Sequence, residues 1–331
     1  MQSKKILVTG GAGYIGSNTV GKLIQAGFQV VVVDNLSTGF EKNLHPEAIF
    51  YREDILNTPQ ITDIILREHI FAIVHFAAKI VVPESLSHPH LYYKNNTQGV
   101  LSILEAIKMT GGLVKHFIFS STAAVYGNPE RGGDCISEEF PTLPINPYGM
   151  SKLMSEKLIT DCEKELSMTS VILRYFNVAG ADTDLKFGQR SNKATHLIKL
   201  ASETALKKRD QLEITGTDYP TKDGTGVRDY IHVEDLATVH VLALEYLMRG
   251  HASEIFNCGY GKGFSVKEVI ETMQAVTKES FKVTHAARRP GDAAMLVADS
   301  SKLKKALNWM PAHDSLEEIC RSAYLFEKHE V

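Results

Sequence analysis

Cysteine is scarce in this sequence, which has four in 331 residues: Cys135, Cys162, Cys258 and Cys320. No two of them form a C-x-x-C pair, so the spacing excludes the common zinc-binding motifs and gives no sign of a disulfide framework. Unpaired thiols are typical of a reducing compartment, where most cysteines are small buried residues. We therefore expect a cytoplasmic protein.

Long hydrophobic runs are also missing. The apolar segment that follows Lys4 and Lys5 stops at Gly10, which is too short for the hydrophobic region of a signal peptide. No stretch approaches the ~18 uncharged apolar residues that a membrane span requires. The sequence thus predicts an intracellular protein without a membrane partner.

Neither sign of charge is in excess. Lys and Arg number 36 against 39 Asp and Glu, for a net charge of −3. Electrostatic capture of nucleic acid or of an anionic membrane by the whole protein is therefore not expected. The histidines, among them His75, His88, His90 and His285, form no H-x-x-x-H or H-E-x-x-H pattern, so we predict no metal site.

What the sequence does have is a regular alternation of short apolar runs with longer mixed segments. The apolar runs predict buried strands at residues 6–9, 30–33, 49–51, 73–76, 117–120 and 171–175. The mixed segments predict helices at residues 15–26, 59–68, 89–109 and 148–165. Strands that are apolar at both odd and even positions are covered on both faces. The fold class predicted is therefore α/β, a doubly wound, Rossmann-type parallel sheet.

The rhythm changes after about residue 177. Residues 182–193 and 218–228 are polar or turn-rich and predict loops. Helices are predicted at residues 195–207, 234–248, 265–277, 300–307 and 315–327, with a short strand at 254–258. We expect residues 1–176 to form a cofactor-binding domain and residues 177–331 to form mostly a smaller substrate lobe, with some segments returning to the first domain.

A glycine cluster joins the first strand to the first helix. Gly10, Gly13 and Gly16 form G-x-x-G-x-x-G, and the next strand ends at Asp34, 24 residues after Gly10. Glycine permits a tight turn and close approach to a pyrophosphate, which the helix N-terminus also favours. The strand–turn–helix context is what distinguishes a dinucleotide site from an ordinary glycine-rich turn.

Two carboxylates complete the predicted dinucleotide site. Asp34 can accept hydrogen bonds from the adenosine ribose, and it would repel the 2′-phosphate of NADP, for which Asn35 and its neighbours provide no arginine. NAD is therefore the expected cofactor. Asp54, followed by Ile55, comes after the third strand, where it could bind the adenine amino group or be a surface carboxylate.

The predicted catalytic residues are Thr122, Tyr148 and Lys152. Tyr148 and Lys152 are four residues apart on one helix, so they share a face. A nearby ammonium and the positive nicotinamide ring favour the phenolate, and lowering the tyrosine pKa to ~7 requires about 4 kcal/mol. Tyr148 would then act as a general base, while Thr122, at a strand end, could hydrogen-bond the reacting hydroxyl.

These motifs, together with PYGMSK, LRYFNVAG, DYPTKDGTGVRDYIHVEDLA and ARRPGD, resemble the extended short-chain dehydrogenase/reductases. Within that family the likeness is to the UDP-glucose (UDP-galactose) 4-epimerases and covers nearly the whole chain. The resemblance implies that Tyr148 removes the proton of the sugar 4-hydroxyl while bound NAD takes a hydride from C4. The 4-keto sugar then turns over and receives the hydride on its other face. It also implies a homodimer, formed through the helices at 89–109 and 148–165.

The resemblance further implies two sets of binding residues. The cofactor set is Gly10, Gly13, Tyr14, Ile15, Gly16, Asp34, Asn35, Asp54, Ile55, Phe76, Ala77, Asn95, Ser120, Tyr148, Lys152 and Tyr175. The UDP-sugar set is Thr122, Tyr148, Asn177, His196, Leu197, Arg228, Arg289 and Asp292. The roles of Arg289 and Arg288 could be reversed, and a cofactor contact by Lys79 is left unassigned.

Other activities remain as alternatives. A 4,6-dehydratase needs an acid and a base beside the threonine, but Thr122 is followed by Ala123 and Ala124, which do not titrate. A different epimerase or a decarboxylase of the same family remains open, as does activity on UDP-N-acetylhexosamines, which Leu296 would limit. A non-catalytic NAD-binding protein would have no need of the three catalytic residues together.

Overall fold

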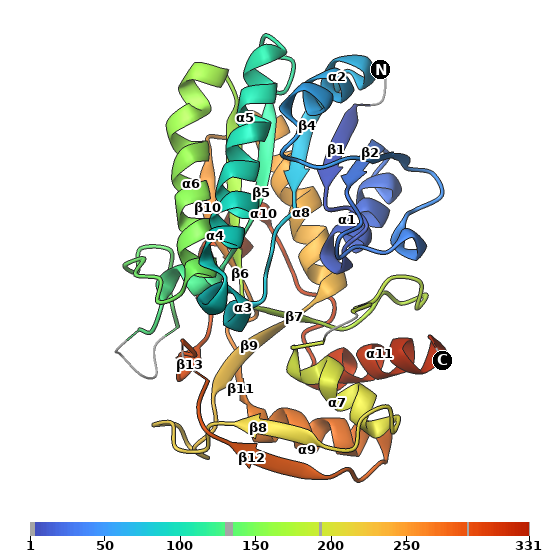
Figure 1. The fold of residues 1–331 in the computed structure, drawn as a ribbon, viewed down its shortest axis with the longest axis vertical. Coiled ribbons are helices and arrows are strands. Elements are labelled where there is room, and N and C mark those ends of the chain that lie inside the picture. Colours follow the sequence, from blue (N-terminus) through green and yellow to red (C-terminus); the bar gives the residue numbers. More distant parts are fainter. Residues whose placement is uncertain (1–3, 130–134, 192–193, 290, 331) are drawn as a thin grey trace.

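A computed structural model describes residues 4–129, 135–191, 194–289 and 291–330 of the chain. Seven parallel strands form its main sheet, in the order β10-β6-β5-β4-β1-β2-β3 (Figure 1). They are β1 (Lys5–Thr9), β2 (Gln29–Asp34), β3 (Ile49–Arg52), β4 (Ile70–His75), β5 (His116–Thr122), β6 (Thr169–Tyr175) and β10 (Glu254–Cys258). The predicted α/β fold is confirmed, although β4 begins and ends earlier than residues 73–76.

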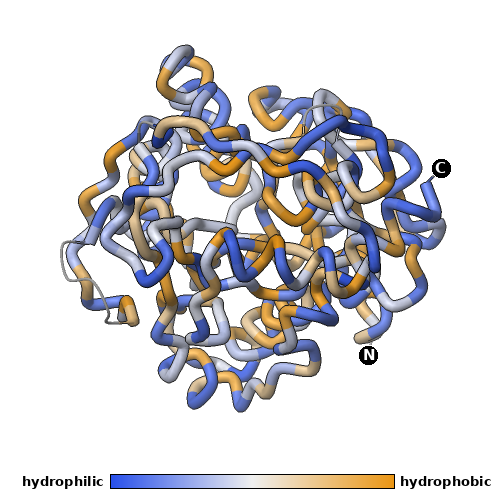
Figure 2. The backbone as a smooth tube through the Cα atoms, turned by 90° about the horizontal axis from the view of Figure 1, so that it is seen from below, coloured by the Kyte–Doolittle hydropathy of each residue, from blue (hydrophilic) through white to orange (hydrophobic). Residues whose placement is uncertain are grey.

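Helices cover both faces of this sheet. One face carries α1 (Tyr14–Gln25) and α8 (Val233–Met248), and the other carries α2 (Thr58–Glu68), α5 (Gly99–Met109) and α6 (Pro147–Leu166) (Figure 1). Successive strand residues face opposite sides, so Leu7 and Val31 pack in one core cluster while Val8 and Val32 pack in the other. This double burial explains why the strands lack an alternating polar pattern. In the outer helices, hydrophobic and hydrophilic residues alternate along the chain, as expected for helices with one apolar face (Figure 2).

The strand order reverses next to β1, which lies between β2 and β4. In open parallel sheets the loops at the carboxyl ends of the strands diverge at such a point and leave a crevice for a ligand. The glycine turn after β1 and the ends of β2, β4, β5 and β6 all lie on this edge of the sheet. The topology therefore brings together residues that are up to 165 positions apart, Gly10 and Tyr175 among them.

The predicted helix at 89–109 is not regular. It divides into α4 (Pro89–Tyr92), a π-helical turn (Tyr93–Gln98, η2) and α5, and it is preceded by α3 (Val82–Ser87), which the sequence patterns did not predict. Side-chain bonds of Asn96 explain the wide turn: its amide donates to the Lys79 carbonyl at 3.0 Å and to Ser151 Oγ at 3.0 Å. Tertiary contacts thus override the helical pattern here.

The second lobe is built around β9 (Val227–His232), so part of the predicted loop at 218–228 is a strand. Its neighbours are β7 (Asn177–Ala179), β11 (Gly263–Ser265) and β13 (Met295–Leu296), and β8 (Leu212–Thr215) pairs separately with β12 (Val283–Ala286). The lobe also contains α7 (Leu197–Ala205), α9 (Val266–Thr277) and α11 (Leu316–His329). By contrast, α8, β10 and α10 (Ser301–Leu307) pack against the main sheet or each other.

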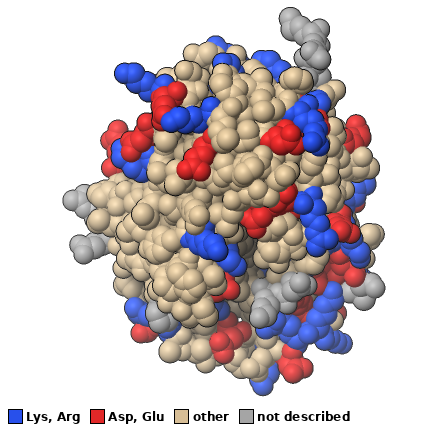
Figure 3. Space-filling model, turned by 45° about the horizontal axis from the view of Figure 1, so that its top comes forward, with Lys and Arg blue, Asp and Glu red and all other residues tan. Residues whose placement is uncertain are grey.

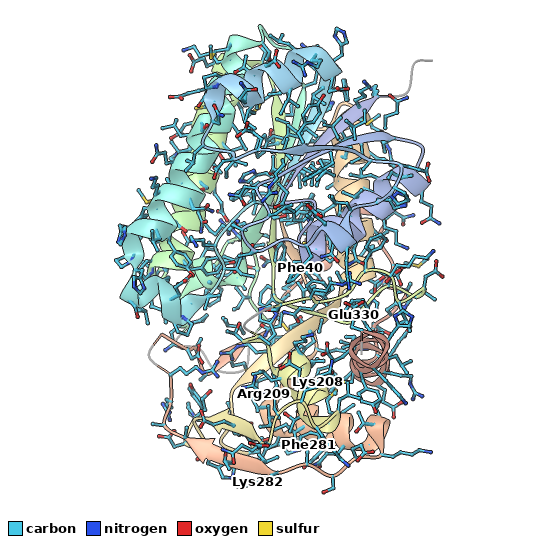
Figure 4. All side chains as sticks on the ribbon, turned by 45° about the vertical axis from the view of Figure 1, so that its right-hand side comes forward. Phe40, Lys208, Arg209, Phe281, Lys282 and Glu330 are labelled. Carbon is cyan, nitrogen blue, oxygen red and sulfur yellow. The ribbon has the colours of Figure 1, made fainter. Side chains whose placement is uncertain are left out.

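Arg190 connects the two lobes. Its guanidinium donates to Asn43 in the first lobe and pairs with Glu330 near the C-terminus, with an Nη2–Oε1 distance of 2.6 Å. Phe40 lies at the same junction, where its N–H donates to the Ala12 carbonyl at 3.0 Å, and Figure 4 labels Phe40 and Glu330. The second lobe is therefore attached close to the glycine turn. Among the described residues no helix is both long and apolar enough to cross a membrane.

Candidate active site

The glycine turn is held tightly against its neighbours. Gly10 has a φ of +74° and its N–H donates to the Val33 carbonyl at 2.8 Å. A Cβ on Gly10 would lie 2.7 Å from the Ala77 nitrogen, and one on Gly16 would collide with the Gly10 carbonyl. Larger residues would therefore displace the backbone. The N-terminus of α1, whose N-cap Gly13 has no side chain, is left available for an anion.

The carboxylate of Asp34 lies beneath this turn. It accepts hydrogen bonds from the Ala12 N–H at 3.0 Å and the Leu36 N–H at 2.8 Å. Burial raises the pKa of Asp34 above its ordinary value, against the effect of these two bonds. Each oxygen retains a lone pair for a further donor such as a ribose hydroxyl. Beside it, Asn35 donates to Asp54 at 2.9 Å, so the predicted adenosine-binding residues meet at one place.

The loop after β4 forms the other wall of the crevice. The Phe76 N–H donates to the Thr9 carbonyl at 2.9 Å, and Ala77 lies against Gly10. Asn95 lies on the π-helical turn and donates to Asn96 at 3.1 Å. Asn96 was not predicted from the sequence. Its side chain accepts the Lys79 N–H at 2.8 Å and donates to Ser151, so it fixes this loop to α6.

The predicted catalytic residues lie together at the end of β5 and the start of α6. Asn146 caps α6 by accepting the Gly149 N–H at 2.8 Å, which places Tyr148 in the first turn. Tyr148 is 7% exposed, Lys152 2% and Thr122 8%. Thr122 is close enough to Tyr148 for its hydroxyl to lower the pKa of the phenol. Lys152 Nζ donates to the Ser120 carbonyl at 2.8 Å.

The protonation of this group differs from the expectation. Burial raises the pKa of Tyr148, and the neighbouring Thr122 hydroxyl only partly opposes that effect. Burial also lowers the pKa of Lys152 to about 7, with Glu156 acting in the opposite direction. The prediction of a lowered tyrosine pKa is therefore wrong for the protein groups alone, because desolvation outweighs the attraction of an ammonium that is itself only partly charged.

A buried histidine that the sequence did not single out supports this site from behind. His240 on α8 bonds the Leu236 carbonyl through Nδ1 at 2.8 Å and Ser120 Oγ through Nε2 at 3.0 Å. Its ring also lies 4.7 Å from that of Phe76. A lone histidine on an apolar helix gives no sequence signal. Tyr175 lies at the end of β6, where burial raises its pKa and the nearby Ser120 opposes that effect.

Strand pairing in the second lobe positions Arg228, one of the predicted UDP-sugar residues. In the register of β13 with β9, Leu296 lies opposite Arg228. The Arg228 guanidinium donates to the carbonyls of Ala293 at 2.7 Å and Val227 at 2.8 Å. Leu296 also packs against the apolar cluster that contains Ala123, next to Thr122. Leu296 thus lies between the predicted phosphate-binding and catalytic residues.

The structure separates the two neighbouring arginines. Arg288 pairs with Asp218 at 2.6 Å and covers the ring of Tyr219 at 4.3 Å. Arg289 is half-buried and has no ion pair among the residues that the structure describes. It is followed by a turn in which the Asp292 N–H donates to the Arg289 carbonyl at 3.3 Å. This arrangement favours Arg289 over Arg288 for an anionic ligand.

The remaining predicted substrate residues lie on β7 and at the start of α7. Asn177 is the exposed first residue of β7, and His196 and Leu197 begin α7. His196 Nδ1 lies 2.6 Å from Gln189 Nε2, and burial lowers the pKa of His196. A neutral imidazole is therefore expected at neutral pH.

Among the described residues, one group of side chains has ligand atoms close enough together to hold a cation. The ligand atoms of His232, Glu234 and His313 lie within 4.8 Å of one another. However, Glu234 already pairs with Lys22 at 2.9 Å, and His232 bonds the Glu234 N–H at 3.2 Å. Glu234 therefore already has a cationic partner in the Lys22 ammonium.

The doubly wound sheet, the glycine turn at its switch point and the buried Thr–Tyr–Lys group define a dinucleotide-dependent protein of the short-chain dehydrogenase/reductase class. Residues 6–259 match the family described as the NAD dependent epimerase/dehydratase family, and the chain belongs to this family.

Named relatives match over nearly the full length. The chain is 49% identical to the UDP-glucose 4-epimerase of Azospirillum brasilense, covering 98% of this chain and 92% of the relative. The structure of UDP-glucose 4-epimerase from Brucella ovis in complex with NAD superposes with a TM-score of 0.93, at 39% identity and 98% coverage of both chains. The UDP-Glc/GlcNAc 4-epimerase from Campylobacter jejuni is 47% identical, with a TM-score of 0.85 and coverage of 99% of this chain and 100% of that chain. The resemblance inferred from the sequence is thus confirmed.

Proposed function

We propose that the protein interconverts UDP-glucose and UDP-galactose by inverting C4 of the hexose, with NAD as a bound cofactor. The observation that carries this proposal is the convergence of Thr122, Tyr148 and Lys152 on the sheet edge that also holds the glycine turn. The near full-length relatives named UDP-glucose 4-epimerase support it. NAD supplies the hydride acceptor that removes hydrogen from C4 and returns it.

The cofactor is held by residues of the first lobe. The glycine turn and the N-terminus of α1 receive the pyrophosphate, and Asp34 binds the ribose hydroxyls. Asn35, Asp54 and Ile55 surround the adenine end, whereas Phe76, Ala77, Asn95, Ser120 and Tyr175 line the nicotinamide end. In this assignment residues 1–176 form the cofactor domain, and residues 177–331 form the substrate lobe except where α8, β10 and α10 return to the main sheet.

Proton transfer belongs to Tyr148. Its phenolic oxygen accepts the proton of the 4-hydroxyl and returns it after the sugar has turned over. Thr122, beside Tyr148, orients the same hydroxyl. The Lys152 ammonium stabilises the phenolate form. Since burial alone raises the Tyr148 pKa, the additional positive charge of the oxidised cofactor is needed to make this tyrosine an effective base.

The substrate is anchored through its diphosphate rather than its hexose. Arg228 and Arg289 bind the phosphates, a task suited to the planar guanidinium group. Asn177, His196, Leu197 and Asp292 hold the rest of the nucleotide sugar. Anchoring at this end leaves the 4-keto hexose free to turn over, as inversion requires.

Dehydration is disfavoured by the same geometry. Ala123 and Ala124 follow Thr122 at the start of a short 3-10 helix, and neither supplies the acid or base that removal of water would need.

The size of Leu296 favours a second class of substrate, since leucine leaves more room beside Arg228 than a tyrosine would. The relative from Campylobacter jejuni is named as an epimerase for both UDP-Glc and UDP-GlcNAc. We therefore include UDP-N-acetylhexosamines as candidate substrates.

The proposed assembly is a homodimer in the cytoplasm. Leu101 on α5 is 40% exposed, and Met150 and Met154 on α6 are 36% and 45% exposed. These two helices lie side by side on the outer face of the first lobe (Figure 1), where a second copy would cover the apolar side chains.

Basic and acidic side chains are interspersed over the face in Figure 3, with no single-sign patch that would favour nucleic acid.

Incubation of the purified protein with UDP-galactose, without added NAD, tests the proposal. Chromatography should detect UDP-glucose, and UDP-N-acetylgalactosamine in a parallel reaction should give UDP-N-acetylglucosamine. The absence of UDP-glucose from a preparation that contains bound NAD would overturn the main assignment. Failure with the N-acetylated sugar alone would overturn only the second one.

A further inference from the structure

A buried ion pair lies one helical turn beyond the predicted catalytic lysine. Tyr148, Lys152 and Glu156 follow one another at intervals of four residues on α6, so they share one face of that helix. Glu156 is 3% exposed, and Arg174 on β6 is 5% exposed. Arg174 donates to Glu156 through Nη2 at 2.6 Å and Nε at 3.0 Å. The proposed proton transfer makes no use of this pair.

Glu156 also binds the strand end that carries the site. The Ser121 hydroxyl donates to Glu156 Oε1. Ser121 is flanked by Ser120, whose carbonyl accepts Lys152 Nζ at 2.8 Å, and by Thr122. A substitution at Glu156 would therefore alter the positions of the residues that orient both Lys152 and the sugar hydroxyl.

The far side of Arg174 is closed by further hydrogen bonds. Its Nη1 donates to Tyr126 Oη at 3.1 Å, and that hydroxyl donates to Asn257 Oδ1 at 2.7 Å. Asn257 Nδ2 in turn donates to the Ile136 carbonyl at 2.7 Å. Because Arg174 is fixed on both sides, Glu156 has a permanent counter-ion in the interior.

Few other charges face Lys152. On β4, His75 is neutral at physiological pH, since burial and the nearby Lys152 lower its pKa to about 3. On β6, the guanidinium of Arg174 is directed at Glu156 through two hydrogen bonds. On α6, Tyr148 is neutral in the absence of the cofactor, because burial raises its pKa. Glu156 is thus the negative group that opposes the loss of a proton from Lys152.

We propose that Glu156 is a positioning residue for the epimerase reaction, which keeps Lys152 in its ammonium form and holds Ser121 so that Thr122 meets Tyr148. The inference rests on the proposed function. It differs from a purely structural role, because a structural ion pair would affect the free energy of unfolding but not the ionisation of Lys152 and Tyr148.

The test compares Glu156→Gln with wild type and with a control, Glu68→Gln. Glu68 is also buried and ion-paired, at 2.7 Å from Lys5, but it lies at the opposite edge of the sheet. Bound NAD, thermal unfolding, and kcat and KM for UDP-galactose across pH are measured for each protein. E156Q should retain NAD and change KM by less than about twofold, while kcat at neutral pH falls about tenfold or more.

The pH profile carries the decisive readout. Without the Glu156 charge the Lys152 pKa falls, so the alkaline limb of kcat should move about one unit toward lower pH. E68Q should lose stability but keep the wild-type profile. Because E156Q leaves Arg174 unpaired and could fold poorly, the double variant E156Q/R174M removes both charges and should show a limb shift of the same direction. An alkaline limb unchanged in both variants overturns the inference.

A second readout separates this inference from the proposed function. Ultraviolet difference titration follows formation of the Tyr148 phenolate, with Y148F as the reference, and needs no substrate. Ionisation of Tyr148 should require higher pH in E156Q than in wild type, and an unchanged titration contradicts the positioning role. Wild-type protein that fails to convert UDP-galactose would refute the proposed function, whereas the phenolate titration would still decide the role of Glu156.

Discussion

Lys152 should make the protein less stable at neutral pH than a neutral side chain of the same length would. Its pKa falls from 10.5 to about 7 because the ammonium is almost completely buried. Since one pH unit corresponds to about 1.4 kcal/mol, desolvation costs roughly 4–5 kcal/mol while the group is charged. The hydrogen bond from Nζ to the Ser120 carbonyl returns about 1–2 kcal/mol of this.

The pH dependence of this cost has a definite sign. Below about pH 7, Lys152 is protonated in both the folded and the unfolded protein, so the full cost is present. Between pH 7 and 10.5 the unfolded chain binds more protons than the folded protein, and the contribution of Lys152 to stability therefore rises with pH. Above that range the folded and unfolded forms both carry a neutral lysine.

Lys152→Met tests this reasoning through urea unfolding at several pH values. At pH 6 the variant should be more stable than wild type by about 2–4 kcal/mol, although it should lose nearly all turnover. The difference should shrink and then reverse as the pH approaches 10, where only the hydrogen bond of wild type remains. A stability difference that does not vary between pH 6 and 10 would refute the argument that the ammonium is buried at a cost.

Three further substitutions test the assigned roles. Tyr148→Phe should retain NAD but lower kcat by about 10²–10⁴-fold, and activity equal to wild type in a steady-state assay would remove Tyr148 from the mechanism. Leu296→Tyr should suppress turnover of UDP-N-acetylhexosamine more than that of UDP-galactose, and equal losses in the two coupled assays would show that Leu296 is not the limit. Arg289→Ala should raise KM for UDP-galactose at least about tenfold, whereas the matched variant Arg288→Ala should change it less than about threefold; the reverse order would exchange their roles.

The main sheet was predictable because each of its strands is specified by residues that are close together in the sequence. Strands such as β1 and β2 are apolar on both faces, and the turn after β1 needs glycine for steric reasons that involve its immediate neighbours. Short strands of the second lobe were not predictable in the same way. β7 has three residues and β13 has two, and both are defined by pairing with β9, more than 45 residues distant in the chain.

The contacts inside the site were likewise not predictable, because they join residues that are far apart in the sequence. Tyr148 and Lys152 were found from their spacing on one helix, but the contact of Lys152 with Ser120 crosses 32 residues. His240 reaches Ser120 across 120 residues. Likewise, the distinction between Arg288 and Arg289 depends on Asp218, 70 positions earlier. That burial raises the Tyr148 pKa in the protein without its cofactor could not be predicted, because the extent of burial is a property of the folded protein.

Transfer of the C4 hydrogen is the step that most directly tests the proposed reaction. UDP-galactose carrying deuterium at C4 would be converted in ordinary water and the product examined by mass spectrometry and NMR. If hydride moves to bound NAD and back, the UDP-glucose formed retains the deuterium at C4. Loss of deuterium to the solvent during conversion would contradict this mechanism.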